Sequence, residues 1–345
     1  MIVKNIGIPK RILIIQIKQV GDVLLTTPVI KALRDEFPSA EIDFLVNKNS
    51  SQILLNNHNL NKILVYDDRN ALMNIINVRN RKYDWVLDFL GNPRSAILAF
   101  LSGARVKAGF AHNWRAILYN VKVKPQKGPR YVVDFKLDIL RYMGISCPNK
   151  GLELYLSDEE RRKIKDYLKS INISENDFIV SLSPTSRRPA RRWKPEYYAK
   201  LGEMLMDRFG AKLFLLWGPG EEYQIEEVLK HTSKKFHVIP KFTLRELAAF
   251  IEVTKFMVAN CNGPKHISEA LKIPNIVIYG PTEPSSWSLV ATWSKWIRAE
   301  GIDCVECGLQ ICNRDMRCMN QLLPDKVMEF FENNFSEIAE AYKIR

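Results

Sequence analysis

The feature that most constrains this 345-residue chain is an alternation of short apolar runs with helix-length segments. Four runs in the first half are typical of buried strands: Arg11–Lys18, Glu41–Val46, Lys62–Tyr66 and Trp85–Phe89. Helix-length mixtures of polar and apolar residues separate them. Consecutive parallel strands need a crossover, usually a helix, so this alternation indicates a parallel sheet. The first half is therefore predicted to be a doubly wound α/β domain.

The second half repeats the alternation. Strands are predicted at 178–183, 212–217, 237–239, 255–259 and 275–279, and helices near 196–208, 220–231, 244–252 and 264–272. Sheets of this kind bind ligands beyond the carboxyl ends of their strands. We therefore expect an α/β chain of two facing Rossmann-like domains with a cleft between them.

A charged stretch after Leu152 marks the expected junction. Ser157 and Glu160 have the spacing of a capping box, and the charge run 158–163 fits a solvated helix face. We place the domains at 1–165 and 166–322. Residues 323–345 are expected to form a last helix that packs back on the first domain.

Composition narrows the function classes. No apolar run approaches the roughly 18 residues of a membrane span, and the N-terminus lacks a signal-peptide cleavage site, so we expect a cytoplasmic protein. The net charge of +13 favours an anionic partner, either a phosphorylated substrate, an acidic membrane surface or nucleic acid. The alternative is a basic surface without a partner. No RNP-like or helix-turn-helix pattern appears, which argues against a nucleic-acid binder.

Asp22 is the first candidate for chemistry. It stands beside Gly21 in a loop that directly follows the first predicted strand. A carboxylate there could accept the proton of an attacking hydroxyl. It could equally cap the following helix, and the spacing leaves both interpretations open.

The loop after the first strand of the second half concentrates basic and hydroxyl groups. Guanidinium and hydroxyl donors can neutralise a diphosphate. The candidate phosphate ligands of this loop are Ser183, Thr185, Ser186, Arg187, Arg188, Arg191, Arg192 and Lys194. An exposed basic turn is the alternative.

Three further candidates, Asn262, Gly263 and His266, open a predicted helix after a strand, where helix N-termini attract phosphate. The alternative for His266 is a structural side chain. In a turn at the end of another strand, either Glu221 or Glu222 could bind ribose hydroxyls.

Four thiols lie close together near the C-terminus, at Cys304, Cys307, Cys312 and Cys318. Their C-x2-C-x4-C-x5-C spacing fits a tetrahedral structural zinc. Disulfides are disfavoured in a cytoplasmic protein, so uncoordinated thiols or a redox pair are the alternatives. Cys147 and Cys261 have no such partners and fit buried small side chains.

These segments, in this order, resemble the ADP-heptose:lipopolysaccharide heptosyltransferases, glycosyltransferase family nine, over essentially the whole chain. The resemblance is carried by Ile12–Ile15 with Gly21–Pro28, Phe37–Val46, Tyr83–Asp88, Arg191–Pro195, Gly263–His266 and Tyr279–Pro284. It implies a GT-B fold, an N-terminal domain for the anionic lipopolysaccharide-core acceptor and a C-terminal domain for an ADP-sugar. It also implies transfer with inversion and without a catalytic metal.

The resemblance assigns roles to single positions. Asp22 falls on the family's proposed base, Glu221 near its ribose-binding acid, and Asn262, Gly263 and His266 on its diphosphate-binding turn. Arg191 falls where members often have a phosphate-binding Lys, and the exchange keeps the charge but changes its geometry.

One departure concerns the donor sugar. Cys261 stands where the family usually has an Asp that contacts the sugar. We therefore expect a heptosyltransferase at the cytoplasmic face of the inner membrane, with the donor sugar less constrained than the nucleotide. The competing interpretation is a catalytically idle protein that binds a sugar nucleotide or a lipopolysaccharide precursor. The four-Cys segment also resembles a pattern in many members, without an assigned role.

Overall fold

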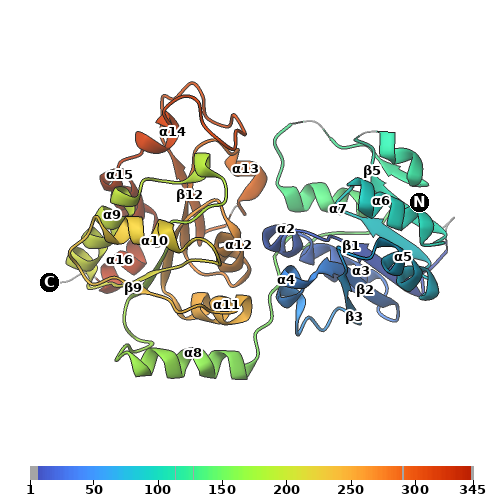
Figure 1. Cartoon of the computed structure of the whole chain (residues 1–345), viewed down its shortest axis with the longest axis horizontal. Coiled ribbons are helices and arrows are strands. Elements are labelled where there is room, and N and C mark those ends of the chain that lie inside the picture. Colours follow the sequence, from blue (N-terminus) through green and yellow to red (C-terminus); the bar gives the residue numbers. More distant parts are fainter. Residues whose placement is uncertain (1–6, 113, 127, 290, 343–345) are drawn as a thin grey trace. The chain divides into compact units, whose positions relative to one another are not determined.

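The chain folds as two compact units, Met1–Tyr155 and Leu156–Arg345 (Figure 1). The structure is a computed structural model, and it describes residues 7–112, 114–126, 128–289 and 291–342. Each unit holds a six-stranded sheet in which all paired strands are parallel. The predicted α/β class and the two doubly wound domains are confirmed.

The sheet of unit one has the order β3-β2-β1-β4-β5-β6. Its strands are β1 (Arg11–Ile15), β2 (Glu41–Asn47), β3 (Lys62–Tyr66), β4 (Trp85–Asp88), β5 (Val106–Phe110) and β6 (Val121–Val123). The central strands β1 and β4 are covered on both faces, which explains why they are almost continuously apolar. The sequence analysis missed β5 and β6, where Lys and Gly interrupt the apolar pattern.

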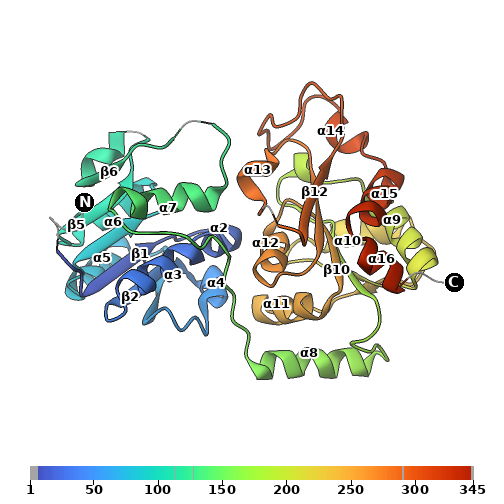
Figure 2. The same cartoon turned by 180° about the vertical axis from the view of Figure 1, so that it is seen from behind.

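Helices cover both faces of this sheet (Figure 2). They are α2 (Val20–Leu24), α3 (Thr27–Glu36), α4 (Lys48–Ser51), α5 (Ala71–Asn80), α6 (Pro93–Leu101) and α7 (Val132–Tyr142), with the 3-10 helices η1 (Gln52–Leu54) and η2 (Trp114–Leu118). Helix α3 packs against α7, whereas α5 packs against α6 and α6 against η2.

The sheet of unit two has the same layout, in the order β12-β11-β10-β7-β8-β9. Its strands are β7 (Ile179–Ser183), β8 (Lys212–Leu215), β9 (His237–Val238), β10 (Phe256–Asn260), β11 (Asn275–Tyr279) and β12 (Ser294–Arg298). The sequence analysis missed only β12, an edge strand with polar ends.

The helices of unit two match the predicted ones closely. They are α8 (Asp158–Ser170), η3 (Pro189–Arg191), α9 (Pro195–Phe209), α10 (Glu222–Leu229), α11 (Leu244–Val253), α12 (Gly263–Ala270), α13 (Pro284–Trp287), α14 (Arg317–Asn320), α15 (Pro324–Asn334) and α16 (Ser336–Tyr342). The predicted capping box is present, since the Ser157 side chain accepts from Glu160 N–H and Glu160 accepts from Ser157 N–H.

One predicted boundary differs from the structure. The division falls after Tyr155 rather than after residue 165, because α8 packs on α11 and so belongs to unit two. The expectation that 323–345 packs back on the first domain stays a prediction. Helix α15 packs on α9, and the Phe331 ring lies 4.6 Å from that of Phe256 in the core of unit two. Aromatic burial in its own unit fixes this segment.

Candidate functional site

Each sheet has one point at which the strand order reverses. In unit one it lies between β1 and β4, and in unit two between β7 and β10. Loops that leave neighbouring parallel strands in opposite directions open a crevice at the carboxyl edge of the sheet. Nearly all of the residues singled out in the sequence lie in the loops at these two points.

Asp22 lies at the switch point of unit one, in the first turn of α2. Gln19 is the N-cap residue of this helix, and the Asp22 carboxylate accepts a long hydrogen bond of 3.4 Å from the Gln19 N–H. The N-cap alternative is therefore wrong in its position, because Asp22 lies three residues inside. Its carboxylate is partly exposed and weakly engaged, as a proton acceptor for an incoming hydroxyl requires.

A buried lysine supports the loop that carries Asp22. Lys136 on α7 is 3% exposed and donates to Gln16 Oε1 at 2.7 Å. Gln16 in turn donates to the carbonyl of Lys18, the residue before the cap. Burial lowers the pKa of Lys136 to about 8, while the charges of Asp22 and Asp88 oppose the shift. A cation therefore lies inside the fold within electrostatic reach of the candidate base.

The loop after β4 forms the other side of this switch point. Asp88 is fully buried and accepts from the N–H groups of Leu90 and Gly91 and from the hydroxyl of Tyr119, at 2.7–3.0 Å. These bonds fix the loop. A small open pocket of about 210 Å³ lies here, lined by Ile17, Lys18, Tyr66, Asp68, Leu90, Asn92, Pro93 and Arg94. Its lining holds two cations, Lys18 and Arg94, and one acid, Asp68, which pairs with Arg94 at 3.2 Å, so the lining has a net positive charge that suits an anionic ligand.

In unit two, Asn262 joins the loops after β7 and β10. Its amide donates to Ser183 Oγ at 2.8 Å and to the Thr185 carbonyl at 3.0 Å, while its Oδ1 accepts from the Lys265 N–H. Asn262 is thus the predicted N-cap of α12. The hydrogen bonds hold the hydroxyl-bearing loop against the helix N-terminus, where backbone N–H groups favour an anion.

Arg191 lies at the same helix terminus. Its guanidinium donates to the Cys261 carbonyl at 3.4 Å and lies 3.8 Å from the Cys261 sulfur. Burial lowers the pKa of Arg191. Cys261 itself is 4% exposed and packs with Val277 and Tyr279, so the predicted small buried side chain is confirmed. A side chain added at Gly263 would meet no atom within 4 Å, which leaves room in front of α12.

His266 has structural partners. It is 4% exposed, and its Nδ1 lies 3.1 Å from Glu269 Oε2. Glu269 also pairs with the fully buried Lys265 at 2.9 Å. Despite the burial of Glu269, the Lys265 charge and the hydrogen bond with His266 hold the pKa of Glu269 below its usual range. This cluster fixes the first turn of α12 and favours the structural interpretation of His266, and a role of His266 in anion binding stays a prediction.

Glu221 begins α10 after β8. Its carboxylate accepts from the Gly218 N–H at 3.0 Å, which shapes the turn after β8. Among the described residues, Glu221 makes no hydrogen bond to Arg191. Helix α10 is instead joined to the basic loop through Gln224, whose side chain accepts from the Ser186 N–H at 3.1 Å.

Backbone hydrogen bonds join the four-Cys segment to the loops after β7 and β11. Gln310 O accepts from Ala190 N–H at 3.1 Å, next to Arg191. The N–H groups of Glu306 and Gly308 donate to the carbonyls of Gly280 and Pro281 at 3.0 and 2.7 Å.

The thiols lie near one another but differ in exposure. Cys304 and Cys318 are buried and Cys307 is exposed. Burial raises the pKa of Cys318 to about 11, and the other three thiols add to this shift. Across the described ranges, no group of three or more His, Cys, Asp or Glu side chains is placed to hold a metal ion. The thiols do not fit zinc as they are arranged, and the structural zinc stays a prediction that metal analysis of the purified protein would test.

Sequence reasoning missed the buried supports of both switch points. These are Gln16, Asp88 and Lys136 in unit one and Gln224, Asn260, Lys265 and Glu269 in unit two. Only Lys265 and Glu269 carried a local signal, a charge pair spaced i, i+4 on a predicted helix. The other contacts join residues far apart in the chain.

Comparison with known proteins identifies the family. A family model described as glycosyltransferase family 9 (heptosyltransferase) matches residues 75–313, more than half of the chain. This chain belongs to that family. It is therefore a glycosyltransferase, and the resemblance inferred from the sequence is confirmed.

Relatives agree with this assignment over nearly the full length. Lipopolysaccharide heptosyltransferase 1 of Escherichia coli O18:K1:H7 is 24% identical, with 95% of this chain and 99% of the relative covered. Among solved structures, the family 9 glycosyl transferase of Veillonella parvula DSM 2008 superposes with a TM-score of 0.84 at 22% identity, covering 95% and 97% of the two chains. The E. coli heptosyltransferase WaaC with ADP-2-deoxy-2-fluoro heptose gives 0.71 at 23% identity, covering 94% and 99%.

These structural matches confirm the GT-B class of fold. The interdomain cleft stays a prediction, and each unit of this glycosyltransferase is described by itself. The roles of the single site residues are likewise not tested by the comparisons. Among the described residues, no helix is long and apolar enough to cross a membrane.

Proposed function

We propose that this family 9 glycosyltransferase moves a heptose from an ADP-sugar to the inner core of lipopolysaccharide, with inversion. The full-length relative is named as a lipopolysaccharide heptosyltransferase, and a structural neighbour was solved with an ADP-heptose analogue. The observation that carries the proposal is the hydrogen-bonded assembly of Ser183, Thr185, Arg191 and Asn262 around the N-terminus of α12. It is a site for a diphosphate that must depart with negative charge.

Unit two would hold the donor. The Arg191 guanidinium, the Ser183 and Thr185 hydroxyls and the first N–H groups of α12 can bind the diphosphate and stabilise it as it leaves. Glu221, at the neighbouring strand end, would accept from the ribose hydroxyls. These groups supply the positive charge and donors that the leaving group needs, so we propose that transfer requires no metal.

Unit one would activate the acceptor. Asp22 takes the proton of the acceptor hydroxyl while that oxygen bonds to the anomeric carbon and the bond from this carbon to ADP breaks. Attack from the side opposite the leaving group inverts the anomeric centre. Lys18 and Arg94, which line the pocket of unit one, would attract the anionic core.

The donor sugar is the least constrained part of the proposal. Cys261 replaces an acid that members of the family use toward the sugar, and here its sulfur lies beside Arg191. Thermal-shift screening of ADP-heptoses and other nucleotide sugars, followed by mass spectrometry of the transferred group, identifies the sugar.

Asp22→Asn tests the base. We expect the variant to bind ADP-heptose like the wild type but to lose roughly 10²–10⁴-fold in kcat, the range that general-base catalysis contributes. Asp35→Asn is the matched control, because Asp35 is an exposed acid paired with Lys31 on the surface of α3. Near wild-type transfer by Asp22→Asn would overturn the base assignment. A wild-type protein that binds the donor but transfers nothing would favour the idle binding protein instead.

The acceptor is anchored in a membrane, so we also propose that the protein works at the cytoplasmic face of the inner membrane as a peripheral protein. Its net charge of +13 suits an anionic lipid surface.

A further inference from the structure

The positive charge of this protein is concentrated in one segment. Residues 62–130 contain 13 Lys and Arg against 4 Asp and Glu, a difference of nine out of the net +13, in one fifth of the chain. The four acids are largely engaged within the fold. Asp88 is buried, Asp84 accepts from the N–H groups of Lys10 and Arg11, Asp68 pairs with Arg94, and Asp67 accepts from Arg69 N–H. The surface of this segment is therefore strongly cationic.

The same segment exposes an unusual amount of apolar surface. Among the described residues, 17 large apolar side chains are exposed, and eight of them fall between residues 62 and 130. Seven lie on three helices: Leu72, Met73 and Ile76 on α5, Ile97 and Phe100 on α6, and Trp114 and Ile117 on η2. We call these seven the apolar face of unit one. Leu72, Trp114 and Ile117 are 67%, 68% and 70% exposed, far more than core packing allows.

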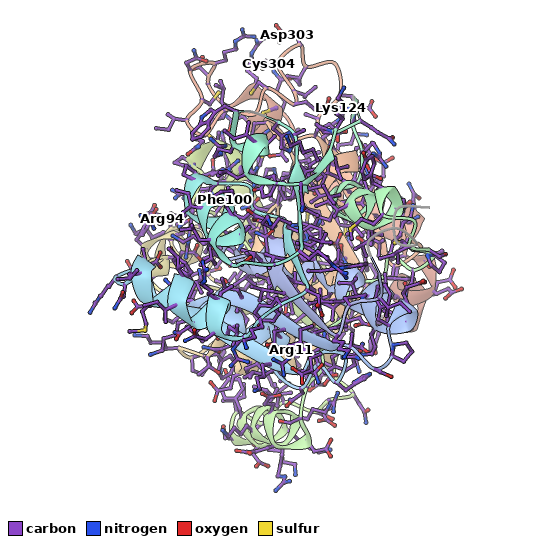
Figure 3. All side chains as sticks on the ribbon, turned by 90° about the vertical axis from the view of Figure 1, so that its right-hand side faces the viewer. Arg11, Arg94, Phe100, Lys124, Asp303 and Cys304 are labelled. Atoms are coloured by element: carbon purple, nitrogen blue, oxygen red, sulfur yellow. The ribbon has the colours of Figure 1, made fainter. Side chains whose placement is uncertain are left out.

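The apolar side chains of this face recur at helical spacing on neighbouring helices. On α6, Ile97 and Phe100 are three residues apart, and Arg94 lies three residues before Ile97, so all three share one side of the helix. Figure 3 labels Arg94 and Phe100 near each other on this helix. On α5, Leu72 and Ile76 share one side and Arg79 follows them. Since α6 packs against both α5 and η2, the three helices that carry the exposed apolar side chains are neighbours, and each carries a cation: Arg79 on α5, Arg94 on α6 and Arg115 on η2.

Trp114 and Arg115 on η2 form a pair that is typical of a lipid interface. The Arg115 guanidinium lies 6.0 Å from the centre of the Trp114 ring, and its Nε donates to the Gly91 carbonyl. Trp favours the level of the lipid headgroups, and Arg can extend its apolar stem along the ring while its charge meets phosphate.

We propose that the apolar face of unit one docks on an anionic lipid bilayer, with its apolar side chains among the headgroups and acyl chains and the flanking cations on lipid phosphates. The proposal deepens the membrane association of the proposed function and does not depend on catalysis. Apolar side chains framed by Lys and Arg are the pattern of a peripheral amphipathic surface. A second copy of the chain would bring two strongly cationic surfaces together, which opposes self-association. The phosphate backbone of a nucleic acid could contact the cations but offers no apolar surface to cover the aliphatic side chains.

Vesicle flotation with the full chain tests the proposal. We expect the wild type to float with vesicles of phosphatidylcholine containing phosphatidylglycerol, and much less with phosphatidylcholine alone. Leu72→Ser/Ile76→Ser/Phe100→Ser/Trp114→Ser should reduce the bound fraction about tenfold or more, because four anchors leave the lipid. Salt near 0.5 M should weaken wild-type binding, since it shortens the screening length.

Matched controls separate docking from other causes. Leu55→Ser/Val238→Ser/Leu309→Ser/Ile311→Ser removes as many exposed apolar side chains elsewhere and should float like the wild type. Asp22→Asn should also float like the wild type, so a failure of docking and a failure of transfer are distinguishable. Retained ADP binding and a native circular dichroism spectrum show that the variants are folded.

Three outcomes would overturn the proposal: wild type that binds no anionic vesicles, a fourfold apolar-face variant that floats undiminished, or a wild-type oligomer that this variant converts to monomers. The last result would assign the face to a second copy of the chain.

Discussion

At the scale of single residues, Lys136 is the clearest case of a buried charge that supports the loop of a proposed site residue. Its ammonium is removed from water and donates a hydrogen bond to Gln16, which positions the loop of Asp22. Burying a charge with so few partners is unfavourable. We expect Lys136 to be a positioning residue that acts on the reaction through this loop.

Lys136→Met keeps most of the length of the side chain and removes its charge. We expect kcat to fall about tenfold or more with little change in ADP affinity, because the geometry of the base loop changes and the donor site does not. Steady-state kinetics and ADP titration measure both quantities. Lys122→Met, an exposed lysine of unit one, is the control.

The pH dependence of the unfolding free energy is a second measurement. It depends on the buried charge of Lys136 and would be the same in wild type and variant if this side chain only filled space. The folded pKa of Lys136 is about 8, below the ordinary value of 10.5. Below pH 8 the charge is buried in the folded state, and between pH 8 and 10.5 only the unfolded state stays charged. Wild type should therefore gain up to about 1.4 kcal/mol per pH unit relative to Lys136→Met over that interval. Parallel pH profiles of the two unfolding free energies would contradict the buried charge.

At the scale of elements, the contacts of α8 explain why the chain divides after Tyr155 and not at the predicted residue 165. Two of its charged residues are not simply solvated. Arg161 pairs with Glu252 at 2.8 Å, and Glu160 receives two hydrogen bonds of 2.7 Å from Arg245, both partners lying on α11. The expected solvated face holds for Asp158 and Glu159, which are exposed.

Glu160→Gln tests how α8 is held. The Arg245 guanidinium lowers the pKa of Glu160 to about 2, so its carboxylate stabilises the fold above the ordinary value of 4.5. This contribution is lost as the pH falls from about 4.5 toward 2. At pH 7 we expect the variant to lose about 2 kcal/mol of unfolding free energy, since Arg245 is buried and loses a charged partner.

Chemical denaturation measures this difference, with Glu159→Gln as the control. Glu159 makes only an exposed pair with Lys163 at 3.4 Å, and its loss should cost less than about 0.5 kcal/mol. Equal effects of the two variants would mean that the contact with α11 does not stabilise the helix.

At the scale of the whole molecule, the proposed function divides the roles between the two units. Unit one carries the cationic segment, the apolar face and Asp22, while unit two carries the loops around α12. Binding of the nucleotide and binding of the membrane are therefore expected to be separable by mutation.

Arg191→Ala should weaken ADP binding roughly 10- to 100-fold, because a partly buried guanidinium bonded to phosphate contributes about 1.5–3 kcal/mol. The same variant should float with anionic vesicles like the wild type, whereas the fourfold apolar-face variant should bind ADP normally. Isothermal titration and flotation measure the two properties. A shared loss in both variants would mean that the two functions are coupled. Arg188→Ala, in the same loop but exposed, is the control for the loss of a positive charge.

The sequence by itself determined the architecture and the family. Buried parallel strands are continuous apolar runs, so β1, β2, β7 and β10 could be predicted directly, and the loops after β1, β7 and β10 contain Asp22, Arg191 and Asn262. The strands β5, β6 and β12 were not predicted, because a strand at or near a sheet edge tolerates polar residues and so loses the apolar pattern. A hydrophobic pattern in the sequence reflects only constraints between residues that are close together in the chain.

Only the tertiary structure decided which residues support the site. Lys136 meets Gln16 across 120 positions of the chain, Ser186 meets Gln224 across 38, and the C-terminal helices join the core of unit two. These contacts depend on how the loops and helices pack, and no periodicity encodes them. The apolar face also depends on the tertiary structure. The side of each helix that packs on the sheet decides whether Leu72 and Phe100 are buried or exposed.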